Sequence, residues 1–167
     1  PMPLKPILLL LAFGSGFCLM ALEMLGARVL RPCFGGSIAV WGALISVFLA
    51  ALGVGYALGG RYADRGGGLK VLAFCFLFAG FWLLAFPLYG AFIPKALSAA
   101  FETWELSAAA SVKFGPLASA VILFAAPCVA MGAATPFLVK FSVEKLDVVG
   151  MRTGDVYAAG TFGSIAG

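Results

Sequence analysis

Four long apolar runs dominate this sequence, and they constrain its fold more than any other feature. They occupy residues 7–27, 38–58, 71–93 and 114–139, and polar connections separate them. A helix needs about 20 mainly apolar residues to cross the hydrocarbon core of a bilayer, and each run meets that length. A fifth apolar segment begins at residue 156. The pattern predicts an all-α, polytopic bundle of transmembrane helices that forms a single domain over residues 1–167.

Composition supports a membrane protein and argues against nucleic-acid binding. The chain is 63% hydrophobic and only 11% charged, whereas about 25% of residues are charged in soluble domains. The net charge of +4 comes from basic residues scattered between apolar runs, so they form no single cationic face for nucleic acid. The lipid bilayer is therefore the first partner that we expect. Histidine is absent and the four cysteines lack metal-like spacing, so we expect no metal and no cofactor in this chain.

The basic residues also predict an orientation, because cytoplasmic loops are enriched in Lys and Arg. With a cytoplasmic N-terminus, seven basic residues lie on that side and four on the other. The seven are Lys5, Arg61, Arg65, Lys70, Lys140, Lys145 and Arg152, and the four are Arg28, Arg31, Lys95 and Lys113. We therefore expect an integral protein of a bacterial inner membrane with its N-terminus in the cytoplasm.

Glu23 is the one ionisable side chain inside the first apolar run. A charge at the bilayer centre costs roughly 2.5 kcal/mol or more, so this carboxylate needs a partner or a wet cavity. Arg28 and Arg31 follow it, and Arg31 falls on nearly the same helix face. Two interpretations remain open: a salt bridge with these arginines that fixes helix packing, or a buried carboxylate that binds a cation or a proton.

Glycine and proline mark two further positions in the apolar runs. Gly55 and Gly59 are four residues apart, a spacing that lets helix backbones approach closely in lipid. Pro127, Gly132 and Pro136 interrupt the fourth run and predict a kinked helix. Kinks are common in transmembrane helices, although broken helices also line solute sites in transporters. Packing is the first interpretation of both features, and substrate binding is the second for the fourth run.

The polar connection after the second run carries a more specific pattern. It reads Gly60-Arg61-Tyr62-Ala63-Asp64-Arg65-Gly66-Gly67 and resembles the GxLaDrxGrk signature of the major facilitator superfamily, which lies in the cytoplasmic turn between the second and third helices. Asp64 is suited to cap a helix N-terminus and to pair with a neighbouring arginine. We therefore expect Gly60, Arg61, Asp64 and Arg65 to form a cytoplasmic latch. Such a latch either moves and gates a transporter, or is a static staple of the loop.

Two other polar stretches complete the expected topology. Residues 96–111 are amphipathic and predict an interfacial helix or loop. Residues 140–155 predict a second polar loop, in which Asp155 is placed to cap the fifth helix.

Together these stretches resemble the membrane part of the fused major-facilitator/spermidine-synthase family. Four segments carry the resemblance: ALEMLGARVLRPCFGGSIAVWG at 21–42, LGVGYALGGRYADRGG at 52–67, LFAAPCVAMGAATPFLVK at 123–140 and GDVYAAGTFGSIAG at 154–167. They occur in the family's order and cover about half of the chain. In the first segment, Arg31 and Cys33 replace the alanine and tyrosine that are common in the family. These differences add a charge and remove a hydroxyl group.

The resemblance implies the N-terminal part of a major facilitator half, truncated in its fifth helix, and hence a piece of a longer protein. In that family a Rossmann-like aminopropyltransferase domain often follows the helices and uses decarboxylated S-adenosylmethionine to convert putrescine to spermidine. The motifs of that domain are not in these residues. The resemblance therefore assigns no catalytic residue here, and it places the cofactor in an absent downstream domain.

The function implied is a membrane module that anchors a synthase-like domain and passes polyamine or a related solute to it. One alternative is part of a major facilitator secondary transporter, whose partners are the remaining transmembrane helices of the parent chain. A second alternative is a non-catalytic structural subunit of the membrane.

Overall fold

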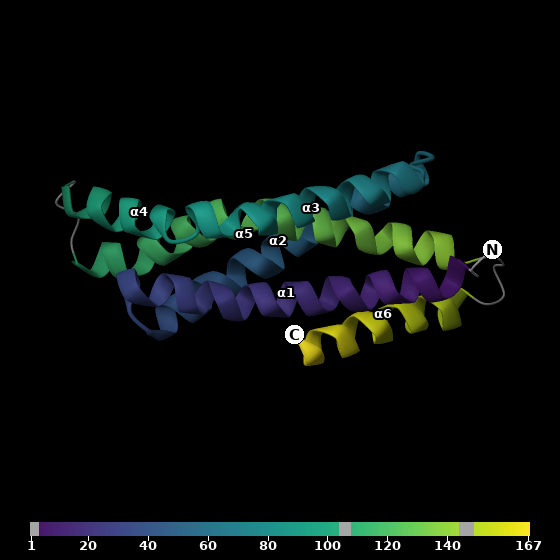
Figure 1. Cartoon of the computed structure of the whole chain (residues 1–167), viewed down its shortest axis with the longest axis horizontal. Coiled ribbons are helices and arrows are strands. Elements are labelled where there is room, and N and C mark those ends of the chain that lie inside the picture. Colours follow the sequence, from purple (N-terminus) through teal and green to yellow (C-terminus); the bar gives the residue numbers. More distant parts are fainter. Residues whose placement is uncertain (1–3, 104–107, 144–148) are drawn as a thin grey trace.

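The computed structural model describes residues 4–103, 108–143 and 149–167, and this part of the chain forms six α-helices (Figure 1). The helices are α1 (Leu4–Phe34), α2 (Ile38–Asp64), α3 (Leu69–Tyr89), α4 (Phe92–Thr103), α5 (Ala108–Ser142) and α6 (Val149–Ala166). Four of them, α1, α2, α3 and α5, are long and apolar enough to cross a membrane. The chain is therefore a helical membrane protein, as the four apolar runs predict.

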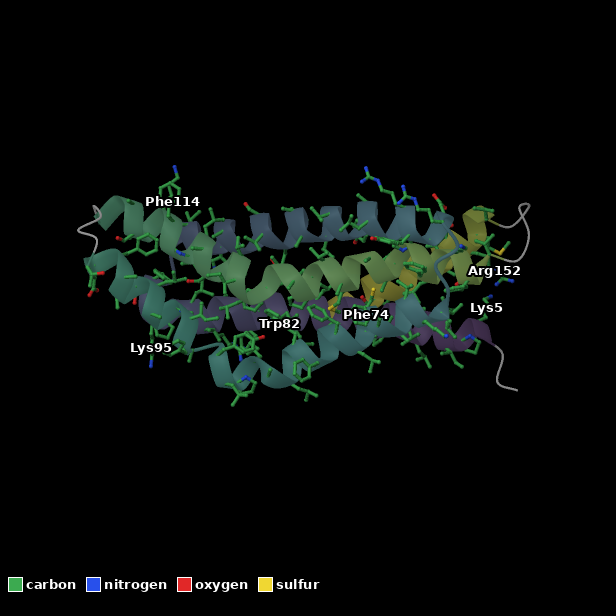
Figure 2. All side chains as sticks on the ribbon, turned by 90° about the horizontal axis from the view of Figure 1, so that it is seen from above. Lys5, Phe74, Trp82, Lys95, Phe114 and Arg152 are labelled. Carbon is green, nitrogen blue, oxygen red and sulfur yellow. The ribbon has the colours of Figure 1, made fainter. Side chains whose placement is uncertain are left out.

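The six described helices run roughly along one long axis (Figure 1). The α1–α2 turn, α4 and the start of α5 lie at one end, and the α2–α3 turn and the start of α6 lie at the other. Lys5 and Arg152 accordingly lie at the end opposite to Lys95 and Phe114 (Figure 2). The helix α5 contacts all five other described helices, so it is the centre of the bundle.

Two glycines in the left-handed region allow the tight turns on either side of α2. Gly35 has a φ of 76°, and its N–H donates to the Arg31 carbonyl at 2.9 Å to close α1. Gly66 has a φ of 91°, and the next N–H, that of Gly67, reaches back to the Tyr62 carbonyl at 2.9 Å. Glycine adopts this backbone conformation without the steric cost that other residues meet.

The close contact between α2 and α5 depends on small residues. Gly55 and Gly59 are buried in α2, and they face the backbone of α5 so closely that there is no room for a side chain. A β-carbon at Gly55 would lie 2.5 Å from the Val129 carbonyl oxygen, and one at Gly59 would overlap the Ala133 carbonyl. Gly132 stands on the α5 side of the same contact, against Leu52.

Several helix ends differ from the expected spans: α1 and α6 are longer, because helical hydrogen bonding continues beyond the apolar runs, and α3 is shorter. The helix α1 continues to Phe34 instead of residue 27, and α6 begins at Val149 instead of residue 156. The third span ends at Tyr89 instead of residue 93, and the amphipathic helix is α4, which begins at Phe92 and contacts α5 and α1.

Prolines do not interrupt the central helix. The helix α5 is continuous from Ala108 to Ser142 although it contains Pro116, Pro127 and Pro136. The prolines thus remain within one helix, whose packing against its neighbours offsets the missing backbone donors, and the kink expected in this span stays a prediction.

Candidate functional site

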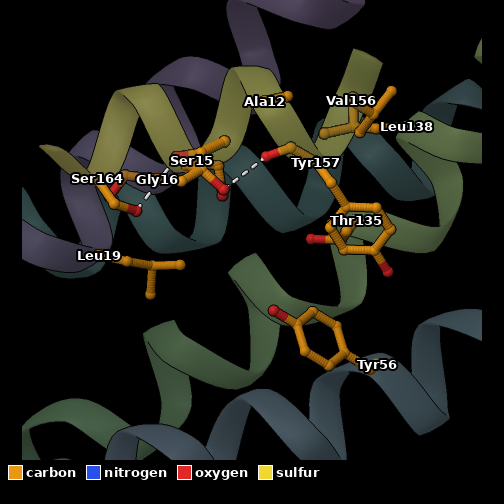
Figure 3. Close-up of a pocket in the computed structure, with 12 residues that line it drawn as sticks. Ala12, Ser15, Gly16, Leu19, Tyr56, Thr135, Leu138, Val156, Tyr157 and Ser164 are labelled. Carbon is orange, nitrogen blue, oxygen red and sulfur yellow. Dashed lines mark hydrogen bonds between the residues drawn. The ribbon is translucent and has the colours of Figure 1, made fainter. Parts of the chain in front are cut away.

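A polar pocket of about 170 Å³ lies between α1, α2, α5 and α6 (Figure 3). Hydroxyl side chains from all four helices reach it. The polar side chains around it are Ser15 of α1, Tyr56 of α2, Thr135 of α5, and Tyr157, Thr161 and Ser164 of α6. Apolar residues complete the wall, namely Ala12, Leu19, Leu138 and Val156. Among the described residues, no charged side chain lines it.

Two of these hydroxyls are engaged with backbone carbonyls. Ser164 Oγ lies 3.2 Å from the Gly16 carbonyl of α1 and 3.2 Å from the Gly160 carbonyl of its own helix. Thr161 Oγ1 donates to the Tyr157 carbonyl at 2.9 Å. The first of these bonds joins α6 to α1 beside the pocket (Figure 3).

The remaining four hydroxyls have no hydrogen-bond partner within the described part of the chain. They belong to Ser15, Tyr56, Thr135 and Tyr157. Ser15 is buried, with 6% of its surface exposed. Tyr56 and Tyr157 are 42% and 56% exposed, and none of the four hydroxyls is among the fully buried, unpaired polar atoms of the described residues, so all four are open to water or to a polar ligand.

The pocket lies midway along the apolar part of α1, where Ser15 and Gly16 line it. Lys5 and Arg28 bracket the apolar part of α1 and are about 35 Å apart along a helix that rises 1.5 Å per residue. This length is close to the roughly 30 Å of a bilayer core. Ser15 and Gly16, which line the pocket, stand halfway between them. Solute sites of secondary transporters are found at this depth.

One ion pair joins α6 to α1, and a second lies within α6. Asp155 of α6 lies 3.6 Å from Lys5 of α1 and 3.8 Å from Arg152. Asp155 is therefore in the interior of α6, not at the N-terminal cap where the sequence placed it. The cap assignment failed because α6 begins seven residues earlier than its apolar segment.

Glu23 is half-buried on α1, and it does not form the expected salt bridge. The ion pairs of the described residues join Asp155 to Lys5 and Arg152, and none involves Glu23. Arg28 does not lie on the same helix face as Glu23, because it is five residues further on and five residues turn a helix by about 140°. The Glu23 carboxylate instead lies close enough to the buried Cys128 of α5 for electrostatic interaction. Leu19 lines the pocket and lies one helical turn before Glu23. Glu23 is therefore on the same face of α1, on the side of the α1–α2 turn.

Arg28 and Arg31 lie elsewhere on α1. They line a separate hollow with Met24, Gly36 and Trp41, at the α1–α2 turn. The structure thus divides the predicted charge site into an acidic part that faces α5 and a basic part at the end of the bundle.

The loop after α2 is also held differently from the expected latch. Asp64 is the last residue of α2, Gly68 precedes α3 as its N-cap, and none of the ion pairs among the described residues includes Asp64, Arg61 or Arg65. The latch that the structure contains is Lys140 of α5, whose Nζ donates to the Ala63 carbonyl at the end of α2. A cation at a helix C-terminus is favourable because it meets unpaired carbonyls and the negative end of the helix dipole.

Sequence reasoning did not single out the pocket hydroxyls. A signal was present in α6, because Tyr157, Thr161 and Ser164 are four and three residues apart and so share one helix face. This signal was not recognised because the three residues lie in an apolar segment, and a hydropathy pattern does not indicate which helix their shared face contacts. Within the described residues no cluster of three potential metal ligands is found.

Comparison of the chain with protein families, with curated proteins and with solved structures finds no match. The fold and the pocket are therefore the observations on which a function can be argued.

Proposed function

We propose that this chain is a membrane-embedded module that binds and passes a small, polar, cationic solute. In the form that the sequence resemblance suggests, the solute is a polyamine and the module anchors a spermidine-synthase-like domain of a longer protein. The single observation that carries the proposal is the hydroxyl-lined pocket halfway across the bundle.

The chemistry of the pocket supports a solute with hydrogen-bond donors. Four hydroxyl oxygens without partners in the described residues offer acceptors for ammonium or amine groups. The pocket wall between them is apolar, with Ala12, Leu19 and Leu138, and this suits the methylene chain that separates the nitrogens of a polyamine. A lipid tail would leave those hydroxyls unsatisfied, so it is the poorer occupant.

Glu23 supplies the charge selectivity in this proposal. It is the one acidic residue in the apolar part of α1, and it lies one turn beyond the pocket residue Leu19. A carboxylate at that depth attracts a cation strongly because the surroundings screen it weakly. A cationic solute would then meet Glu23 before it reaches the hydroxyls, or after it leaves them.

The orientation remains part of the same proposal. Lys5 and Arg152 share one end of the bundle and Lys95 lies at the other (Figure 2), as an antiparallel arrangement of the spans requires. We place the first end in the cytoplasm of a bacterial cell because it holds six of the ten basic residues that the structure describes.

Binding of radiolabelled spermidine to the chain in nanodiscs tests this function. We expect saturable binding to the wild type, and at least tenfold weaker binding to Glu23→Gln, which corresponds to about 1.4 kcal/mol. Tyr157→Phe, which removes a pocket hydroxyl without changing the ring, should weaken binding about three- to tenfold. Glu102→Gln is the matched control, because Glu102 is an exposed acidic residue on α4 and its loss should have no effect.

Absence of saturable binding to the wild type would contradict the proposal, as would equal losses in Glu23→Gln and Glu102→Gln. Saturable binding of a neutral polyol instead of spermidine would favour the secondary-transporter alternative. A chain that binds neither probe but co-purifies with a fixed membrane partner would favour the structural subunit.

A further inference from the structure

The second hollow of the molecule is at the α1–α2 turn, far from the hydroxyl-lined pocket. It has a volume of about 210 Å³, and Arg28 and Arg31 of α1 line it together with Trp41 of α2. Met24, Ala27 and Val40 form its apolar floor, and Gly36 of the turn closes it. Two cationic side chains and an aromatic ring thus surround one concave site.

Neither guanidinium group has an anionic partner within the structure's described ranges. The ion pairs there involve Lys5, Arg152 and Asp155, which belong to the other end of the bundle. The indole N–H of Trp41 also lacks a partner in those ranges, where the Trp82 indole by contrast donates to the Leu123 carbonyl. An arginine pair without a carboxylate is suited to a planar or tetrahedral oxyanion, which guanidinium groups hold through paired hydrogen bonds.

The turn itself orients one of the arginines. The N–H of Gly35 donates to the Arg31 carbonyl, which fixes the backbone of Arg31 at the end of α1. The guanidinium then lies across Gly36, where an added β-carbon would be 3.1 Å from Arg31 Nε and 3.3 Å from Nη2. A glycine at position 36 therefore leaves space for the guanidinium beside the start of α2.

The start of α2 adds to the positive character of the hollow. Ser37 is the N-cap residue, and its side chain makes no capping hydrogen bond. The first backbone N–H groups of a helix have no acceptor within the helix, and they carry the positive end of its dipole. In this molecule they lie beside the two arginines, so helix and side chains favour an anion at the same place.

The depth of the hollow matches the phosphate level of a bilayer. Arg28 is about 35 Å from Lys5 along α1, so one of them reaches each edge of a hydrocarbon core about 30 Å thick. Tryptophan is enriched at that level, and Trp41 is 39% exposed there. Phosphate groups of lipids are the most abundant oxyanions at this depth.

We propose that Arg28, Arg31, Trp41 and the N-terminus of α2 form a binding site for a phosphate group. The phosphate is that of an anionic phospholipid headgroup or is free inorganic phosphate, because both present the same oxygens to the arginines. The site is separate from the solute pocket and does not depend on the function proposed above.

Native mass spectrometry of the chain in a neutral detergent tests the site. The probes are dioctanoyl phosphatidylglycerol, inorganic phosphate, and dioctanoylglycerol, which has the same tails without phosphate. We expect a saturable adduct with at least one phosphate-bearing probe and none with dioctanoylglycerol. Arg28→Gln combined with Arg31→Gln should weaken the adduct at least tenfold. Arg28→Lys combined with Arg31→Lys should recover part of the loss, since the charge remains.

A matched control removes two exposed positive charges away from the site. Lys70→Gln combined with Lys95→Gln should change the affinity less than twofold, and far-UV circular dichroism should show all variants equally helical. Competition by inorganic phosphate identifies free phosphate as a ligand, whereas binding of phosphatidylglycerol without competition identifies a lipid headgroup. Equal losses in the two double-glutamine variants, or equal binding of dioctanoylglycerol, would overturn the proposal.

A second variant addresses the turn. Gly36→Ala displaces the Arg31 guanidinium without removing any charge, so we expect about a threefold weaker adduct. Unchanged affinity in this variant would show that Arg31 does not bind from the position that it has in the structure.

Discussion

Two helix contacts in this molecule use small residues for different purposes. Between α2 and α5, Gly55 and Gly59 face Gly132 and Ala133, and no hydroxyl side chain lies among these residues. Between α1 and α6, Gly163 meets the Phe13 backbone and Gly16 meets the Gly160 carbonyl equally closely, but hydroxyls lie near them and a pocket opens beside them. Small residues thus allow close helix packing in both places, but only the α1–α6 contact lies beside a polar pocket.

Substitution at Gly59 should break the dry contact and have the largest effect. In Gly59→Ala the new β-carbon overlaps the Ala133 backbone, and a backbone cannot move aside as a flexible side chain can. We expect the free energy of unfolding to fall by about 1–3 kcal/mol. Unfolding in sodium dodecyl sulfate, monitored by circular dichroism, measures it. Gly53→Ala is the control, because that β-carbon meets nothing within 4 Å. Equal destabilisation of both variants would show that close packing is not the cause.

Substitution at Gly163 should have a smaller and more local effect. The β-carbon of Gly163→Ala meets the Phe13 backbone of α1, but α6 has no helix behind it in the described structure and can move outward. We therefore expect the free energy of local opening of α6 to fall by about 1–2 kcal/mol, which would be observed as faster hydrogen exchange confined to α6. The control is Gly154→Ala in the same helix, where the added atom has open space. Faster exchange throughout the bundle would instead mean that α6 stabilises the whole fold.

Loss of the Ser164 hydroxyl should have the smallest effect. Ser164→Ala removes the bond to the Gly16 carbonyl, and hydrogen bonds between transmembrane helices contribute about 0.6 kcal/mol on average. Thr161→Ala removes a bond within α6 only, so the difference between the two variants measures the interhelical part. A Thr161→Ala variant at least as destabilised as Ser164→Ala would contradict the role of this bond in holding α6 on α1.

Much of the fold follows from the sequence because hydropathy and turn chemistry are local. Twenty apolar residues give a span wherever they occur, and glycines at positions 35 and 66 mark the tight turns. The small-residue spacing at Gly55 and Gly59 likewise identified the surface of α2 on which the structure places α5.

The site is less accessible from the sequence because its members come from four helices. Apolar residues surround α3 and α5 on all sides, so periodicity does not fix how these helices rotate about their axes. Glu23 was paired with arginines near it in sequence, yet none of the ion pairs among the described residues includes it. Lys140 was assigned to a solvated loop, yet it ends α5 and binds the end of α2.

The spacing of basic residues on α1 and α5 links this protein to the thickness of its membrane. Lys5 and Arg28 are about 35 Å apart along α1, whereas Lys113 and Lys140 are about 40 Å apart along α5. In a bilayer that matches α1, the longer helix must tilt or extend into the headgroups, and a thicker bilayer relieves this mismatch. Both helices line the hydroxyl pocket. The length of the surrounding lipid chains therefore influences the tilt of α5 relative to α1, and with it the shape of the pocket.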